Sequence, residues 1–201
     1  MSQVELSQPE RIRERYERIK TEVGPGVTVV AATKYVPLAE MSLLVEAGIE
    51  VVGENRAQDL EAKHAEYGDA FRWHFIGHLQ SNKVKLVNRI CELVHSLDSH
   101  SAAQRLEVPA LLEVNLSGEA SKSGVAPEEI AAYLSYGIRG LTTMPPAAAD
   151  PEESRPWFAR LRSLAAEHGL EQLSMGTTQD FRVGAEEGAT HVRVGSILFR
   201  E

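Results

Sequence analysis

Two kinds of apolar pattern alternate along the chain. Short runs of consecutive apolar residues are typical of buried strands, whereas apolar residues at every third or fourth position are typical of amphipathic helices. The runs predict strands at residues 27–34, 50–53, 72–76, 93–97, 110–114, 138–142, 171–174 and 191–194. The helical spacing predicts a first helix that ends at Val23, and later helices at 37–47, 56–66, 79–88, 100–106, 127–136, 151–168 and 179–187.

The same spacing assigns side chains to helix faces. Ser7 and Glu10 are spaced as a capping box at the start of the first helix. The second helix is expected to bury Leu38, Met41, Leu44 and Val45. The long helix after Pro151 is expected to bury Trp157, Phe158, Leu161 and Leu164.

Uninterrupted alternation of eight strands with helices favours an α/β fold with a parallel sheet that closes into a (β/α)₈ TIM-type barrel. An open doubly wound sheet is the alternative. Because 201 residues are few for eight units, the helices and loops must be short. The extra N-terminal helix would then cover the gap left by a missing final helix. No linker interrupts the pattern, so we expect one domain over residues 1–201.

Composition narrows the class of protein. The formal charge of −8 and pI near 5.4 disfavour a protein that grips nucleic acid or an anionic membrane. Cys91 is the only cysteine, which excludes an internal disulfide and is typical of a reducing compartment; we expect it to be a small buried apolar residue. The polar first residues do not resemble a secretory signal, and no apolar run is long enough for a membrane span. We therefore expect a soluble, cytoplasmic protein, and a monomer.

The candidate chemistry begins at Lys34, where the apolar run VTVVAATK ends in a single amine. A buried strand that delivers a lysine to its end can hold a Schiff-base nucleophile. The alternative is a lysine that only reaches into solvent.

Two later loops favour the Schiff-base lysine over the solvent-exposed one. In a TIM barrel, phosphate groups often bind in the loops after strands seven and eight. Ser174-Met175-Gly176-Thr177-Thr178 follows the seventh strand, and Arg193-Val194-Gly195-Ser196 ends the eighth. Glycine lets the backbone approach an anion, and the hydroxyl groups can bond to it. Facing a strand-end lysine, the loops indicate a phosphate-bearing carbonyl ligand.

The chain resembles the pyridoxal phosphate homeostasis protein family, whose barrel is shared with the N-terminal domain of alanine racemase. The resemblance covers about residues 29–199, through AATK (31–34), GEN (53–55), WHFIGHLQSNK (73–83), VHSLDS (94–99), EVNLSGEASKSG (113–124), RGLTTMPP (139–146), LSMGTTQDF (173–181) and EEGATHVRVGSILF (186–199). It implies a fold type III barrel that binds pyridoxal 5′-phosphate (PLP), with Lys34 forming the internal aldimine. It also implies that Ser174, Met175, Gly176, Thr178, Gly195 and Ser196 hold the phosphate, and that Arg193 faces the pyridine nitrogen.

The sequence departs from the family at Thr177-Thr178, at Ser196 and at Arg200, and the helices between residues 98 and 139 look short. Asn55 would touch the cofactor ring, and His74 and His78 would line the mouth, although a turn-forming asparagine and structural histidines explain them equally well. Glu54 and Glu113 could serve as acid and base, or be solvated carboxylates. Lys122 could accept the aldehyde transiently, or be a solvated lysine.

Three functions remain open. The first is a PLP carrier in vitamin B6 homeostasis, without fast turnover and with no catalytic or metal-ligating residues, that could supply PLP-dependent apo-enzymes. The second is a PLP-dependent amino-acid racemase. The third is a cofactor-free Schiff-base aldolase acting through Lys34. Visible absorbance of the lysine-bound cofactor separates the third function from the others.

Overall fold

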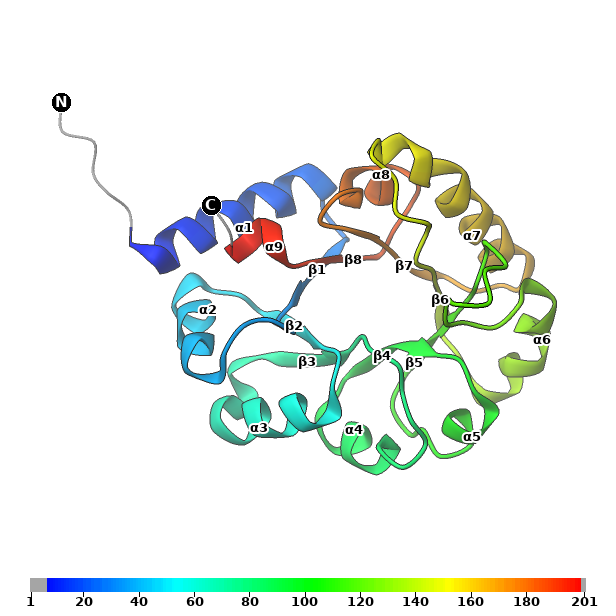
Figure 1. Cartoon of the computed structure of the whole chain (residues 1–201), viewed down its shortest axis with the longest axis horizontal. Helices are drawn as coiled ribbons and strands as arrows, with labels where there is room; N and C mark the ends of the chain where they lie inside the picture. Colours follow the sequence, from blue (N-terminus) through cyan, green and yellow to red (C-terminus); the bar gives the residue numbers. More distant parts are fainter. Residues whose placement is uncertain (1–6, 200–201) are drawn as a thin grey trace.

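A computed structural model describes residues 7–199, in which eight parallel strands form a closed barrel in the order β1 to β8 (Figure 1). Thr28 through Ala31 pair with His191 through Val194, so β8 closes the barrel onto β1. The predicted (β/α)₈ barrel is therefore confirmed, and the open sheet was the wrong alternative. The strands are β1 (Thr28–Ala32), β2 (Val51–Glu54), β3 (Arg72–Phe75), β4 (Leu93–Leu97), β5 (Ala110–Glu113), β6 (Gly140–Thr142), β7 (Gln172–Thr177) and β8 (His191–Val194).

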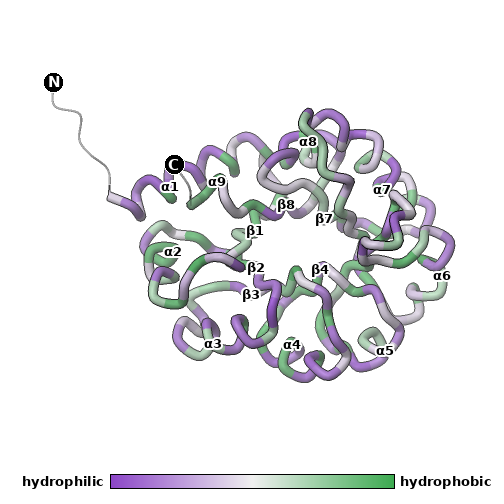
Figure 2. Tube along the Cα trace, in the orientation of Figure 1, coloured by the Kyte–Doolittle hydropathy of each residue, from purple (hydrophilic) through white to green (hydrophobic). Residues whose placement is uncertain are grey.

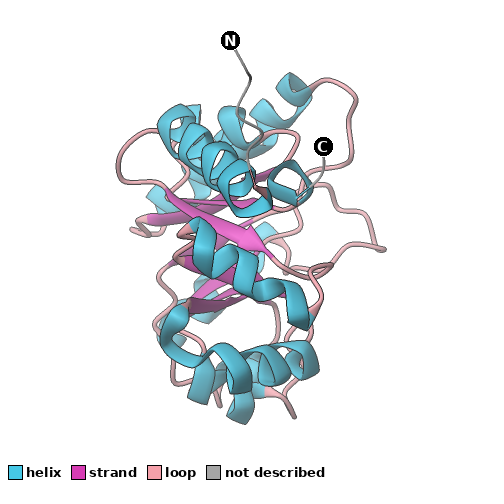
Figure 3. Cartoon of the chain, turned by 90° about the vertical axis from the view of Figure 1, so that its left-hand side faces the viewer, coloured by secondary structure: helices cyan, strands magenta, loops and turns pink. Residues whose placement is uncertain are grey.

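Helices surround the strands (Figures 1 and 3). They are α1 (Gln8–Val23), α2 (Met41–Ala47), α3 (Ala57–Tyr67), α4 (Val84–Ile90), α5 (His100–Ala103), α6 (Ile130–Tyr133), α7 (Arg155–Glu167), α8 (Phe181–Glu186) and α9 (Ser196–Phe199). Short 3₁₀ helices are η1 (Leu38–Glu40), η2 (Gly68–Ala70), η3 (Pro127–Glu129), η4 (Leu134–Tyr136) and η5 (Pro151–Ser154). None of the described helices is long and apolar enough to cross a membrane.

The N-terminal helix completes the outer ring. We expected the final helix to be missing, and this was wrong: α9 is present, as a single turn of four residues. The longer α1 packs against α2, α8 and α9, and so occupies the place of an eighth full helix (Figure 1). Glu10 accepts hydrogen bonds from the backbone N–H and the hydroxyl of Ser7, which fixes the start of α1.

The core lies between the strands and the helices. The helices carry both polar and apolar residues, as Figure 2 shows. Their apolar side chains, such as Ile19, Leu60 and Phe158, are fully buried against the strands. Cys91 is among these buried residues, as predicted.

Several predicted details were wrong. The helix expected from residue 79 begins only at Val84, because Ser81, Asn82 and Lys83 form a turn. Leu38 and Val45 are exposed, since the 3₁₀ turn η1 shifts the phase of the helix that follows. Trp157 is only half-buried, because it lies one position from the buried Phe158 around α7. The departure noted at Arg200 lies outside the described residues.

Strand β7 is longer than predicted and continues to Thr177. Its pairing with β8 shifts register between Ser174 and Thr177, which is the sign of a bulge. Gly176 sits in this bulge with φ 94°, a conformation that side chains rarely adopt. An added Cβ there would also lie 2.9 Å from Phe181 Cα, so glycine lets α8 pack closely on β7.

Candidate functional site

A cavity of about 660 Å³ opens at the carboxyl ends of the strands; we call it the mouth cavity. In TIM barrels this end carries the functional residues. Strands β1, β7 and β8, the segments that follow β1, β2, β3, β6 and β7, and helices α1, α2 and α9 contribute to its wall. Six of the nine predicted site residues line it: Lys34, Asn55, Thr178, Arg193, Gly195 and Ser196.

Lys34 brings an amine to this cavity. It lies two residues after the end of β1, and its side chain is exposed, whereas the preceding Thr33 is fully buried. Its Nζ lies 4.7 Å from the ring centroid of Tyr35, close enough for a cation–π contact. Among residues 7–199, Nζ has no hydrogen-bond or ion-pair partner, so the amine is accessible to a ligand.

Arg193, in β8, brings a buried cation to the wall of the same cavity. It is 8% exposed, and burial lowers its pKa, while the carboxylates of Glu113 and Asp180 act in the opposite direction. Its Nη2 donates to the carbonyl oxygen of Thr143 at 3.0 Å and contacts Met144 Sδ at 3.1 Å. Its Nε is buried and has no partner in the described part of the chain.

Asn55 presents a second unsatisfied atom. Its Oδ1 is buried and finds no hydrogen-bond partner among the described residues. Buried polar atoms in folded proteins almost always have partners. Asn55 and Arg193 both line the mouth cavity, so a polar ligand in that cavity would lie beside both side chains.

The two loops expected to bind phosphate are joined to each other. Thr178 Oγ1 accepts a hydrogen bond from the backbone N–H of Gly195 at 3.1 Å. Thr177 is engaged elsewhere, because its N–H and hydroxyl both donate to Asp180 Oδ1, at 2.7 and 3.0 Å. The exposed hydroxyl of Ser196 has no partner in the described region. The loops thus present a fixed edge with one unengaged hydroxyl.

Ser174, Met175 and Gly176 do not line the cavity, and the prediction that the loop begins at Ser174 was wrong. All three lie inside β7, because the bulge lets the strand continue to Thr177. Ser174 Oγ bonds to His95 Nδ1 at 2.8 Å, and Met175 is fully buried in the core.

The barrel interior holds a cluster of three imidazoles, His74, His95 and His191, which we call the histidine cluster. His74 Nδ1 and His95 Nε2 are 2.9 Å apart, and the His95 and His191 ring centroids are 5.2 Å apart. Burial lowers the pKa of His74 to about 3 and that of His191 to about 4, and lowers that of His95 well below its ordinary value. His74 is therefore a structural histidine and does not line the mouth; His78 is exposed and pairs with Asp98 at 3.0 Å.

Neither of the two carboxylates considered as an acid–base pair, Glu54 and Glu113, lines the mouth cavity. Glu54 is fully buried and forms an ion pair with Lys63, outside the mouth cavity. Burial raises the pKa of Glu113, which also lies outside the lining. Lys122 is tied to Met144 O at 3.3 Å and to Glu119 at 3.5 Å, so it stands near the rim without lining the cavity. No group of three metal-ligating side chains is found within residues 7–199.

Much of the cavity wall was not predicted. Its apolar side includes Ile12, Val36, Leu43, Leu44 and Phe199, which come from α1, α2 with its preceding turn, and α9. Helical spacing marks Ile12 and Leu44 only as core positions and does not mark the other three. Their meeting at the mouth depends on barrel closure, which the sequence pattern does not describe.

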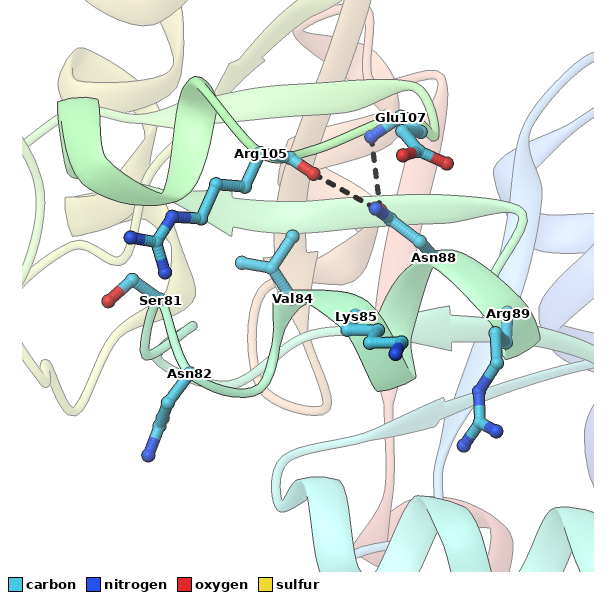
Figure 4. A pocket seen from close by; sticks show the side chains of 8 residues that line it. All are labelled: Ser81, Asn82, Val84, Lys85, Asn88, Arg89, Arg105 and Glu107. Atoms are coloured by element: carbon cyan, nitrogen blue, oxygen red, sulfur yellow. Dashed lines mark hydrogen bonds between the residues drawn. The ribbon is translucent and has the colours of Figure 1, made fainter.

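A second hollow of about 480 Å³ lies beside α4 and shares no residue with the mouth cavity (Figure 4). Asn88 bridges its far wall, donating to the carbonyl oxygen of Arg105 and accepting from the N–H of Glu107. Lys85, Arg89 and Arg105 give it a basic character, but it holds none of the predicted site residues.

Comparisons with known proteins show the family to which the chain belongs. The family model of the alanine racemase N-terminal domain matches residues 8–201. A pyridoxal phosphate homeostasis protein of Aquifex aeolicus is 37% identical, over 95% of this chain and 95% of its own length. One from Pseudomonas aeruginosa is 40% identical, over 86% of this chain and 84% of its own length.

A solved structure shows the same fold. PipY of Synechococcus elongatus, in a structure with PLP bound, is similar with a TM-score of 0.86 and 33% identity. The match covers 94% of this chain and all of that one, 100%.

Proposed function

Because this chain belongs to the pyridoxal phosphate homeostasis proteins, within the family of the alanine racemase N-terminal domain, we propose that it binds PLP and helps to balance the supply of that cofactor. In this role it holds the cofactor as a Schiff base on Lys34, without fast turnover. The observation that carries the proposal is the meeting of the unpaired amine of Lys34 with the polar side chains of Asn55, Arg193 and Ser196 around one cavity.

The residues around the mouth cavity fit PLP. The cofactor carries an aldehyde, a phosphate and a ring nitrogen, and so needs an amine, anion-binding donors and a polar partner for the ring. Lys34 offers the amine, Ser196 offers an unengaged hydroxyl, and the buried atoms of Asn55 and Arg193 lack protein partners. The volume of about 660 Å³ is ample for a small ligand.

Each residue then has a separate task. PLP supplies an aldehyde that condenses reversibly with an amine, and Lys34 is the amine within the cavity. Thr178, Gly195 and Ser196 bind the phosphate. Arg193 would face the ring nitrogen, where its positive charge disfavours protonation of that nitrogen, and Asn55 would orient the ring.

A reversible covalent link suits a protein that stores and releases its ligand. The exposed Lys34 and the half-exposed Met144 leave the mouth open to solvent, so a released cofactor can reach PLP-dependent apo-enzymes. We include such apo-enzymes among the partners of the protein.

The test is the absorption spectrum of the purified protein titrated with PLP. Wild type should gain a visible band, and Lys34→Ala should not. Lys122→Ala is the matched control, because Lys122 lies near the rim but does not line the cavity. A wild type that gives no visible band would refute the proposal and favour a cofactor-free use of Lys34.

A further inference from the structure

Three buried polar side chains form a closed network directly behind the mouth cavity. Lys63 Nζ of α3 donates to the carbonyl oxygen of Thr33 at 2.8 Å and pairs with Glu54 Oε1. The hydroxyl of Thr33 donates to the same Oε1 at 2.5 Å. Thr33 and Glu54 are fully buried and Lys63 is 5% exposed. We call these three residues the α3 clamp.

The clamp adjoins two residues of the site. Thr33 directly precedes Lys34, and Glu54 directly precedes Asn55. Successive side chains of an extended chain point to opposite faces. Because Glu54 meets Lys63 of α3 on the outside of the barrel, the next residue, Asn55, is directed toward the mouth cavity that it lines. Thr33 is likewise buried, whereas Lys34, in the turn that follows β1, lines the cavity.

The bond from Lys63 acts on the backbone of the site itself. Its acceptor, the carbonyl of Thr33, belongs to the peptide group that links Thr33 to Lys34. A fixed peptide plane restricts the direction in which the Lys34 side chain leaves the backbone. The N–H of Thr33 also donates to Gly53 O at 3.0 Å, so the ends of β1 and β2 are held together at this point.

Stability alone is a poor explanation for a charged pair in this place. Replacing a buried ion pair by well-packed apolar side chains is often neutral or stabilising, because the charges no longer have to lose their hydration. In this protein the free-energy cost of burying the charged pair is higher still, because Glu54 Oε2 is buried without a partner among the described residues. What the pair supplies that apolar side chains cannot is a directed link between α3, the Thr33 carbonyl and the end of β2.

We propose that Thr33, Glu54 and Lys63 are positioning residues that aim Lys34 at an aldehyde-bearing ligand. This inference rests on the proposed function. It implies that the clamp matters for ligands that must bond to Lys34, and hardly matters for ligands that are held by the phosphate loops alone.

The test compares two ligands on one double variant. Glu54→Leu combined with Lys63→Met removes both charges, so that neither is left buried alone. PLP can bond to Lys34, whereas pyridoxine 5′-phosphate carries a hydroxymethyl group in place of the aldehyde and cannot. The double variant should bind PLP about tenfold more weakly, the lower end of what loss of an outer-shell partner costs at metal sites. Its affinity for pyridoxine 5′-phosphate should hardly change, because this ligand makes no bond to Lys34.

Two controls separate positioning from a general loss of structure. Val87→Ala removes buried methyl groups from α4, far from the mouth, and should lower the melting temperature without changing the ratio of the two affinities. Amide hydrogen exchange of the ligand-free double variant should be faster at residues 33–36 than in Val87→Ala.

Each other outcome refutes the inference. Equal loss of both ligands would mean general disorder of the site, and unchanged PLP affinity would mean that the clamp is dispensable. If the double variant does not fold, Thr33→Val keeps the backbone carbonyl and removes only the hydroxyl; it must show the same selective loss, to a smaller degree. A wild type that binds pyridoxine 5′-phosphate but shows no link to Lys34 would instead refute the proposed function.

Discussion

Arg193 Nη2 donates a hydrogen bond to the carbonyl oxygen of Thr143 at 3.0 Å, which links the end of β8 to the segment that follows β6. Both residues are buried, so in the folded protein this hydrogen bond is largely shielded from solvent. The Arg193 side chain, which we propose to face the ring nitrogen of PLP, should therefore also contribute to the free energy of unfolding.

Arg193→Met should consequently destabilise the protein, because it leaves the Thr143 carbonyl buried without this donor. The expected loss is about 1 to 3 kcal/mol, measured by urea unfolding. Arg72→Met is the control, since Arg72 pairs with Glu92 on the surface, where such pairs contribute less than about 1 kcal/mol. Equal stability of the two variants would show that the Thr143 carbonyl finds another partner.

Lys34 should be the residue that carries PLP. Borohydride reduces a Schiff base to a stable secondary amine, so reduction of the loaded protein followed by peptide mapping should place the pyridoxyl group on Lys34. Lys63 provides an internal comparison, because its amine is buried and already engaged with Glu54 and should remain unlabelled. A label confined to any other lysine would contradict the assignment.

Removing the hydroxyl of Ser196 should weaken PLP binding only, whereas removing that of Thr178 should also destabilise the fold. Ser196 Oγ has no partner in the described chain, so Ser196→Ala should weaken PLP binding by about 1.5 to 3 kcal/mol and leave unfolding unchanged. Thr178→Ala should lower both quantities, because Thr178 Oγ1 also accepts from Gly195 N–H. Calorimetric titration and urea unfolding measure the two effects. Wild-type affinity in both variants would place the phosphate elsewhere.

The histidine cluster should make the protein sensitive to acid. Folded His74 and His191 stay neutral down to a pKa of about 3 and about 4, whereas unfolded imidazoles bind protons below about pH 6.5. The unfolded state therefore binds more protons in this window, and stability falls as pH falls from about 6.5 to about 4. Each such group adds a slope of up to about 1.4 kcal/mol per pH unit.

His191→Gln should reduce the dependence of unfolding free energy on pH by up to about 1.4 kcal/mol per pH unit, measured by urea unfolding at several pH values between about 6.5 and about 4. Carboxylates titrate at the lower end in wild type and variant alike, so the difference between the two proteins reports the imidazole. His168→Gln, at the end of α7 and outside the cluster, is the control. The same slope in all three proteins would show that the cluster does not control acid stability.

The sequence was sufficient to predict the elements and the ends of strands. The apolar run before Lys34 places that amine at a strand end, and the alternation of eight such runs predicts the barrel whose closure brings Lys34 and Gly195 to one cavity. Strands β4 and β8 have the predicted bounds because their apolar runs end abruptly at polar or glycine residues.

Contacts across the barrel could not be predicted in this way. His95 meets Ser174, 79 positions later, only because the strands tilt and stagger as the barrel closes. The bulge at Gly176 likewise extends β7 beyond Ser174, so that Met175 and Gly176, predicted to bind phosphate from a loop, lie in a strand; a glycine in a sequence does not distinguish a bulge from a loop. The buried pair of Glu54 and Lys63 resembles two ordinary surface residues until α3 is packed on the barrel.

The last prediction is that amino-acid turnover will be negligible. Racemisation requires proton carriers on both faces of the bound amino acid. Of the ionisable side chains that line the mouth cavity among residues 7–199, Lys34, Tyr35 and Glu40 all come from the segment between β1 and α2, and the amine of Lys34 lies against the ring of Tyr35. They therefore approach from one side. The remaining ionisable group is Arg193, whose guanidinium is a poor proton acceptor and whose charge disfavours the protonated pyridine that stabilises a carbanion.

An open mouth also leaves water in the site, which weakens electrostatic stabilisation of charge during reaction. The measurement is to incubate the PLP-loaded protein with L-alanine and other amino acids in deuterated water and to follow loss of the α-proton by NMR. We expect exchange no faster than with free PLP, and Lys34→Ala serves as the control for exchange at the site. Lys34-dependent exchange on the order of 1 per second or faster, a rate typical of enzymes, would replace the carrier by a racemase or a transaminase.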